Sequence, residues 1–135
     1  MSINFDWNED YSIGIQEIDC QHKRFLAFIS EIFMLRQTKP GSSEIQELLK
    51  ELERYLIFHT KSEECMMQMY FYPKYEEQYR EHTQIIKTVK EKIKTLPQTH
   101  EDVMDLLLFL MNWFRNHTTS FDKDFGEYLK RQKGF

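Results

Sequence analysis

The feature that most constrains this chain is a set of four long segments with helical periodicity, separated by three short stretches of turn-forming residues. The separating stretches are TKPGSS at 38–43, YFYPK at 70–74 and TLPQT at 95–99. Within each segment, apolar residues recur every three or four positions, which is the spacing of one face of an α-helix. Because each segment has about 20 residues and the connections are short, neighbouring helices are expected to be antiparallel. The pattern predicts an all-α, up-down-up-down four-helix bundle.

The ends of the predicted helices follow from capping and helix-breaking residues. The first helix is expected to start at Asp19, a favourable N-cap residue, and the second near Ser43. The third begins after Pro73, which suits the first turn of a helix, and ends at Pro97. The fourth helix starts around Thr99.

The two ends of the chain lie outside the four-helix pattern. The N-terminal arm, residues 1–17, has apolar anchors at Phe5, Trp7 and Ile13 but no helical period. We expect this arm to pack across the bundle. The stretch 122–135 is expected to form a short fifth helix.

Length and composition set limits on the class of protein. A chain of 135 residues is expected to form one domain over residues 1–135. The net charge of −4 and the scattered Lys and Arg residues argue against a nucleic-acid partner. No apolar run approaches the roughly 18 residues of a membrane span. The acidic start, MSINFDWNED, is unlike a signal peptide. We therefore expect a cytoplasmic protein without a membrane partner, either a monomer or a weak homo-oligomer.

Histidine placement is the strongest functional signal. Four of the five histidines fall one per helix on the inward apolar stripe, and only His100 does not. A single histidine on such a stripe is usually a core residue with a hydrogen-bond partner. Four buried imidazoles without partners would be costly, and a metal ion removes that cost by taking their lone pairs. The four histidines are His22, His59, His82 and His117.

The positions of these histidines along their helices are compatible with a single site in an antiparallel bundle. They lie at the start of the first helix, in the second half of the second, in the first half of the third and at the end of the fourth. In an antiparallel bundle this order places all four at one end. We therefore predict a metal site near that end of the bundle.

Two carboxylates are candidates to join the imidazoles. Glu63 follows His59 by four residues and shares its helical face. Asp122 follows His117 by five residues, which on a regular helix is about 140° off that face. The helix is therefore expected to end, bend or bulge between His117 and Asp122. By itself, Asp122 would be interpreted as a surface residue.

The ferritin-like di-iron pattern does not fit this chain. Those enzymes use Glu-x-x-His from two helices, whereas His59, His82 and His117 have no Glu three residues before them. An HExxH zinc motif is also absent. The predicted site is rich in histidine and poor in carboxylate.

The chain resembles a known family, the hemerythrins, and in particular the bacterial ones with a single domain. The resemblance covers nearly the whole length, and Trp7 stands where the family has a tryptophan in its arm. Four motifs carry it, in order and at matching spacing. They are IQEIDCQH at 15–22, HTKSEECM at 59–66, YPKYEEQYREH at 72–82 and WFRNHTTSFD at 113–122.

The resemblance implies two iron ions inside the bundle. One iron would take His22 and His59 and keep an open position for dioxygen. The other would take His82, His117 and a third imidazole. Glu63 and Asp122 would bridge the irons, together with an oxo or hydroxo group.

The third imidazole is where this chain departs from the family. The family has His-x-x-x-His on the third helix, and this chain has Gln78-x-x-x-His82. The Gln78 amide oxygen is a weaker, neutral donor that can ligate a metal, or the amide can hydrogen-bond a water that does so. Tyr79 and Glu77 are less favoured oxygen donors.

The sequence is compatible with two functions. The first is an oxygen-binding protein, not an enzyme, for carriage, storage or sensing of dioxygen, favoured by an aromatic and Met-rich lining. The second is a di-iron site whose extra open coordination reacts with peroxide or nitric oxide, favoured by Gln78. A bundle that binds another metal, such as manganese or zinc, is a third interpretation.

Overall fold

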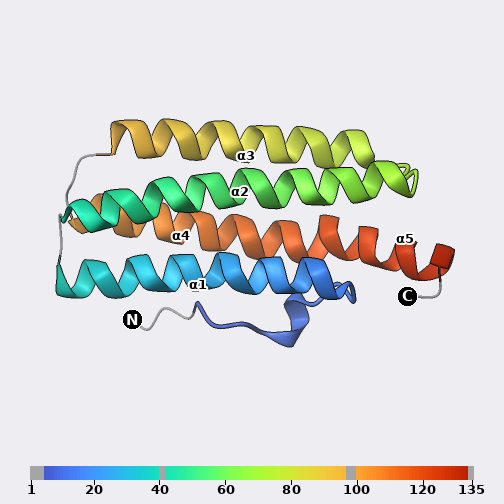
Figure 1. Cartoon of the computed structure of the whole chain (residues 1–135), viewed down its shortest axis with the longest axis horizontal. Coiled ribbons are helices and arrows are strands. Elements are labelled where there is room, and N and C mark those ends of the chain that lie inside the picture. Colours follow the sequence, from blue (N-terminus) through green and yellow to red (C-terminus); the bar gives the residue numbers. More distant parts are fainter. Residues whose placement is uncertain (1–4, 40–41, 97–99, 134–135) are drawn as a thin grey trace.

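The computed structural model describes residues 5–39, 42–96 and 100–133, and it contains the predicted bundle. Four long antiparallel helices run side by side (Figure 1), and the described residues contain no strand. Short helices precede and follow these four. The elements are η1 (Glu9–Tyr11), α1 (Gln16–Thr38), α2 (Ser43–Met69), α3 (Tyr75–Thr95), α4 (His100–His117), the π-helical η2 (Thr118–Asp122) and α5 (Lys123–Lys133). The all-α prediction is confirmed, as is the short C-terminal helix.

The long helices pack against their neighbours in the bundle. The principal contacts join α1 to α2, α2 to α3 and α1 to α4, as expected for an up-down-up-down arrangement. Helix α5 continues α4 beyond the end of the other helices (Figure 1). None of the helices in the described ranges is long and apolar enough to cross a membrane.

The apolar stripes predicted from the sequence meet in a continuous core along the bundle axis. Its most deeply buried side chains come from all of the long helices, and burying each one contributes about 2 kcal/mol. Examples are Ile29, Leu52, Val89, Leu107 and Leu110, none of which has any significant exposure. A smaller apolar cluster lies at the far end, where the arm, the end of α2 and α5 meet. The polar site lies between these two apolar regions.

One predicted helix start is wrong and two are confirmed. Helix α1 begins at Gln16, three residues before Asp19, and its N-cap residue is Ile15. The Asp19 carboxylate accepts hydrogen bonds from the Ser12 hydroxyl (2.6 Å) and the Ile13 amide (2.9 Å). Asp19 therefore attaches the arm to the helix and does not cap it. Helix α2 begins at Ser43 and α3 begins after Pro73, as predicted. Pro97 and Thr99 lie outside the described residues.

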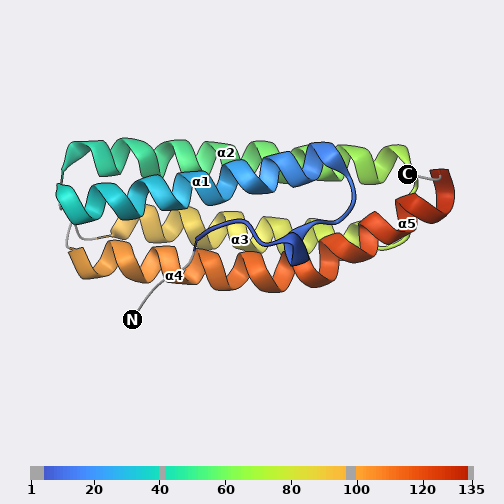
Figure 2. The same cartoon turned by 90° about the horizontal axis from the view of Figure 1, so that it is seen from below.

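The arm packs against the bundle, as the sequence predicted, but it runs along the helices and not across them (Figure 2). Phe5 packs edge-on against Phe33, and Tyr11 packs edge-on against Phe114, each with ring centroids 5.2 Å apart. Gly14 adopts a φ of +79°, which a residue with a side chain rarely reaches, so the arm can turn into α1 there. Close to this turn, Gly126 of α5 leaves room for the arm, because a Cβ at that position would collide with the Ile13 carbonyl.

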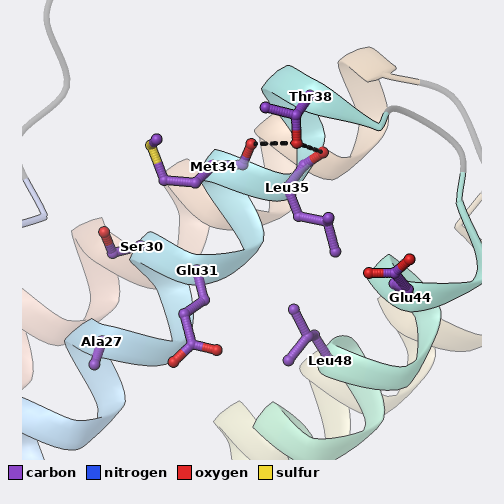
Figure 3. Close-up of a pocket in the computed structure, with 8 residues that line it drawn as sticks. All are labelled: Ala27, Ser30, Glu31, Met34, Leu35, Thr38, Glu44 and Leu48. Atoms are coloured by element: carbon purple, nitrogen blue, oxygen red, sulfur yellow. Dashed lines mark hydrogen bonds between the residues drawn. The ribbon is translucent and has the colours of Figure 1, made fainter.

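A wide surface groove opens at the opposite end of the bundle from the histidines. It has a volume of about 610 Å³ and lies between α1 and α2 (Figure 3). The residues that line it include two glutamates and several aliphatic side chains but no histidine. They are Ala27, Ser30, Glu31, Met34, Leu35, Thr38, Glu44 and Leu48. The groove therefore contributes nothing to the metal chemistry expected of this chain.

Candidate metal centre

Four buried histidines converge at one height in the bundle. Each comes from a different long helix, in agreement with the start, end, start, end order along the chain. No more than 5% of the surface of any of these residues is exposed. Two pairs of rings lie close together, His22 with His59 (centroids 4.7 Å apart) and His82 with His117 (5.1 Å). The bundle thus brings together the four imidazoles that the sequence placed on its inward stripes.

Glu63 lies between the two histidine pairs. Its Oε2 is 3.4 Å from the Nε2 atoms of both His22 and His59. Its Oε1 is 3.2 Å from the Nε2 of His82. One oxygen of this carboxylate therefore faces each pair of imidazoles.

Asp122 has the same bridging position from the other side of the bundle. Its Oδ2 is 3.2 Å from His22 Nε2, and its Oδ1 is 3.3 Å from His117 Nε2. Two potential metal-binding groups result, with ligand atoms within 4.8 Å of one another. One contains His22 and His59, the other contains His82 and His117, and both share the two carboxylates.

Buried polar atoms without partners show that a cation fits this place. Both Glu63 oxygens, Asp122 Oδ2, His82 Nε2 and His117 Nε2 are buried and accept or donate no hydrogen bond. Native interiors rarely leave such atoms unpaired, because each costs about 1–3 kcal/mol. Imidazole nitrogens and carboxylate oxygens that point at a common centre are the donor set of a transition-metal ion. The residues present therefore fit a metal centre.

The outward nitrogens of the imidazoles are held by polar side chains that the sequence analysis missed. Gln21 Oε1 lies 2.7 Å from His59 Nδ1, and Glu64 Oε2 lies 2.8 Å from His82 Nδ1. Such partners fix which nitrogen points at a metal. Gln21 and Glu64 each follow or precede a ligand candidate by one residue, and in the sequence they resemble solvated helix residues. The burial of Glu64, 9% exposed, is visible only in the assembled bundle.

The carboxylates are ionised at neutral pH. Burial and the charge of Asp122 raise the pKa of Glu63, but His59, His22 and His82 more than offset this and lower it to about 2. Burial raises the pKa of Asp122 as well, and His117 and His22 hold it well below its usual range. Both groups are therefore available as anionic ligands.

The imidazoles respond to the same charges in different directions. Burial lowers the pKa of His22, but Asp122 and Glu63 raise it to about 9. Burial likewise lowers the pKa of His82, and Glu63 and Glu64 raise it to about 10. Burial dominates at His59 and lowers its pKa to about 4. In the metal-free protein, His22 and His82 thus carry protons that a metal ion must displace.

A single π-helical turn brings Asp122 into the site. The Lys123 amide donates to the carbonyl of Thr118, five residues earlier, so residues five apart fall on one face. The hydroxyls of Thr119 and Ser120 donate to backbone carbonyls four residues before them, where the helical hydrogen bonds change register. The predicted bulge between His117 and Asp122 is confirmed, and it explains why a five-residue spacing serves this site.

Gln78 lies beside the second pair of histidines. It is 1% exposed, and its Nε2 donates a hydrogen bond of 3.1 Å to Asp122 Oδ1. Its Oε1 is buried and has no partner. Tyr79 is 44% exposed and Glu77 is exposed, so neither lies within the centre. Of the oxygen donors weighed on this helix, only Gln78 reaches the cluster.

A closed apolar cavity adjoins the first pair of histidines. Its volume is about 10 Å³, roughly the space that one water-sized probe occupies. Aromatic and aliphatic side chains dominate its wall, and no methionine belongs to it, which corrects the expected Met-rich lining. The lining residues are His22, Phe25, Leu56, His59, Trp113, Phe114, Thr118 and Asp122. The cavity has room for about one water-sized ligand and is too small for an organic substrate.

The fold and the site define a metal-binding four-helix bundle whose two groups of ligands share a pair of carboxylates. Residues 13–129 match the family described as the hemerythrin HHE cation binding domain. This match covers most of the chain, and the chain belongs to the hemerythrin family. The family resemblance seen in the four sequence motifs is thereby confirmed.

Similar proteins have been named bacteriohemerythrin in several bacteria. The protein of Stenotrophomonas maltophilia is 30% identical over 125 residues, which cover 92% of this chain and 80% of that protein. The protein of Pseudomonas aeruginosa is 32% identical with the same coverage of both chains. The protein of Clostridium acetobutylicum is 24% identical over 126 residues, 90% of this chain and 98% of that protein. The similarity therefore extends over nearly the full length of the bundle.

Proposed function

We propose that this protein is a non-haem di-iron protein that binds dioxygen reversibly, for carriage, storage or sensing. The observation that carries this proposal is the pair of ligand groups that share Glu63 and Asp122 beside a closed apolar cavity. A mixture of imidazole and carboxylate donors suits iron. Membership of the hemerythrin family supports the same choice of metal.

The ligand groups divide naturally into two halves. His22 and His59 would hold one iron, and His82 and His117 would hold the other, with both carboxylates between them. Iron held by these residues would supply the reversible electron transfer that dioxygen binding needs. We place the dioxygen position in the first half, because the closed cavity adjoins His22 and His59.

The walls of the closed cavity determine how a small ligand is treated there. Phe25, Leu56 and Phe114 surround it with apolar surface and are almost fully buried. Such a wall admits an uncharged diatomic molecule and keeps bulk water from solvating the charge that develops on it. The outer partners Gln21 and Glu64 hold His59 and His82 in orientation while this occurs. These features favour binding and release over chemical conversion.

A second candidate function rests on Gln78. This amide occupies the position where a third imidazole is expected, so the second half has one strong donor fewer. A site of this kind would react with peroxide or nitric oxide more readily than a fully ligated one. The cytoplasmic location and the monomeric or weakly associating state stay predictions.

Elemental analysis is the decisive experiment. We expect two irons per chain in the parent protein and in His100→Ala, whose position is about 25 Å from His117 along α4. His59→Ala removes one of the two imidazoles in the first half and should lose iron. Unchanged iron in His59→Ala would show that the ligands are misassigned. Manganese or zinc in the purified parent would favour the third interpretation.

Dioxygen binding requires its own measurement. The reduced, iron-loaded protein should develop a charge-transfer absorption band under dioxygen and lose it under argon, over repeated cycles. A band that never forms, or that forms once and bleaches irreversibly while peroxide is consumed, would favour the second candidate function.

A further inference from the structure

A second cavity adjoins the metal centre at Gln78. It has a volume of about 210 Å³ and lies where the start of α3 meets η2 and α5. Four of its lining residues are exposed, so it opens to solvent, whereas Gln78 is buried. The lining residues of this Gln78 cavity are Tyr72, Lys74, Glu77, Gln78, Ser120, Phe121 and Asp124. One of its walls is therefore the amide that takes the place of the third imidazole.

The hydrogen bonding of Gln78 fixes what its amide does. A carboxylate can only accept hydrogen bonds, so the amide NH₂ must be the end that faces Asp122 Oδ1. The Oε1 atom then points elsewhere and lacks a partner although it is buried. An amide held in this way positions Asp122 through its NH₂ end. Its unpaired oxygen needs a hydrogen-bond donor, and water is the smallest one that fits.

We propose that Gln78 leaves the His82 and His117 half of the centre with an exchangeable position, held by water and reached by small uncharged ligands through the Gln78 cavity. This inference rests on the proposed di-iron function. It implies two different ligand-binding positions in one metal centre. The closed cavity beside His22 and His59 is apolar, whereas the Gln78 cavity is lined mainly by polar residues and opens to solvent.

Charge at the mouth of the Gln78 cavity determines which ligands enter. The Lys74 ammonium lies 3.6 Å from the Asp124 carboxylate, which offsets its charge. Glu77 adds a further negative charge to the same lining. A net negative mouth disfavours anions, so the cavity is expected to select neutral molecules such as water, peroxide in its acid form or nitric oxide.

Nitric oxide provides a probe for the second position, because it is uncharged and small. Reduced, iron-loaded protein is titrated with nitric oxide without air, and bound molecules are counted by infrared and electron paramagnetic resonance spectroscopy. The parent should bind one more nitric oxide per chain than Gln78→His, in which an imidazole fills the position. Gln84→His introduces the same change on an exposed face of α3 and should bind as many as the parent. Azide, an anion, should not gain this extra equivalent in the parent.

A second pair of variants tests the route and does not depend on whether Gln78→His folds. Glu77→Trp places a bulky ring at the mouth of the cavity, and Glu76→Trp removes the same charge at an exposed neighbour that does not line it. Only Glu77→Trp should slow uptake of the additional nitric oxide, measured by stopped-flow absorption.

The outcomes separate this inference from the proposed function. Fewer than two irons per chain in the parent would overturn the proposed function, and this inference with it. Two irons, together with equal nitric oxide counts in the parent and Gln78→His, would overturn the exchangeable position alone. Equal uptake rates in both tryptophan variants would overturn the Gln78 cavity as the route. An additional azide would overturn its preference for neutral ligands.

Discussion

At the scale of single residues, Glu63 has the most demanding position in the molecule. Its two oxygens face three imidazoles from three different helices, and neither oxygen has a hydrogen-bond donor. We propose that a carboxylate placed in this way bridges the metal ions of the two halves of the centre. The effect of replacing Glu63 should therefore be visible both in the metal content and in the stability of the protein.

Replacing Glu63 separates its bridging role from a general loss of charge. Glu63→Ala should lose at least one metal ion per chain and lower the melting temperature of the loaded protein, because metal binding supports the fold. Glu51→Ala, on the exposed face of the same helix, is the matched control. Elemental analysis and calorimetry would measure both effects. A Glu63→Ala variant that stays fully loaded and equally stable would refute the bridging role.

We propose that Glu64 acts on the metal through His82. Glu64→Leu removes the partner of His82 Nδ1, and metal affinity should fall by about 10–100-fold, the usual effect of losing an outer hydrogen bond. Glu64→Gln keeps an accepting oxygen and should recover most of the affinity. Competition with a chelator of known strength measures these constants. Equal affinity in the leucine and glutamine variants would show that this hydrogen bond does not matter.

At the scale of elements, η2 explains how Asp122 reaches the site although it follows His117 by five residues and not by four. A regular helix would turn Asp122 about 140° away from the face of His117. The π turn restores that face and also directs α5 outward past the end of the bundle. One element thus fixes both a ligand and the course of the C-terminal helix.

Deleting Ser120 should convert this turn into regular α-helix. Asp122 would then follow His117 by four residues, but every contact of α5 would rotate by about 100°. Because Phe125 and Leu129 are fully buried, we expect α5 to detach and metal affinity to fall. Ser120→Ala keeps the chain length and should load normally. Metal titration and far-UV circular dichroism would compare the two variants, and a deletion variant with normal loading and stability would contradict this account.

The sequence predicted most of the fold and site for an identifiable reason. Apolar periodicity and breaking residues determine helices that pack locally, so the helix order and the four histidines followed from spacing alone. The start of α1 was wrong because Asp19 satisfies the arm's donors, a contact that no local pattern reveals. Gln21 and Glu64 were missed because their partners lie on other helices. Whether Gln78 faces Asp122 likewise depends on tertiary contacts.

At the scale of the whole molecule, the metal centre introduces charge into a core that is otherwise apolar. In the metal-free protein, the protonated His22 and His82 neutralise the two carboxylates. These imidazoles have folded-state pKa values of about 9 and 10, above the ordinary value of 6.5. Their contribution to stability is therefore complete below about pH 6.5 and is lost as the pH rises through 9 to 10.

The metal-free protein should consequently become less stable between about pH 6.5 and 10. The loaded protein should not follow this decline over the same range, because the metal ion replaces the protons. Urea denaturation at a series of pH values, with and without metal, would measure both curves. Parallel curves would contradict the idea that protons and metal ions compete for these imidazoles.

The outward partners of the imidazoles also bear on how such a chain can change over generations. Gln21 adjoins His22 but holds His59 on the next helix, and Glu64 adjoins Glu63 but holds His82 on the one after. A substitution at position 21 or 64 therefore removes a hydrogen-bond partner from a histidine on a neighbouring helix. We expect positions 21 and 59, and positions 64 and 82, to be substituted together in descendants of this protein. Sequence change at this centre would therefore involve pairs of positions on different helices.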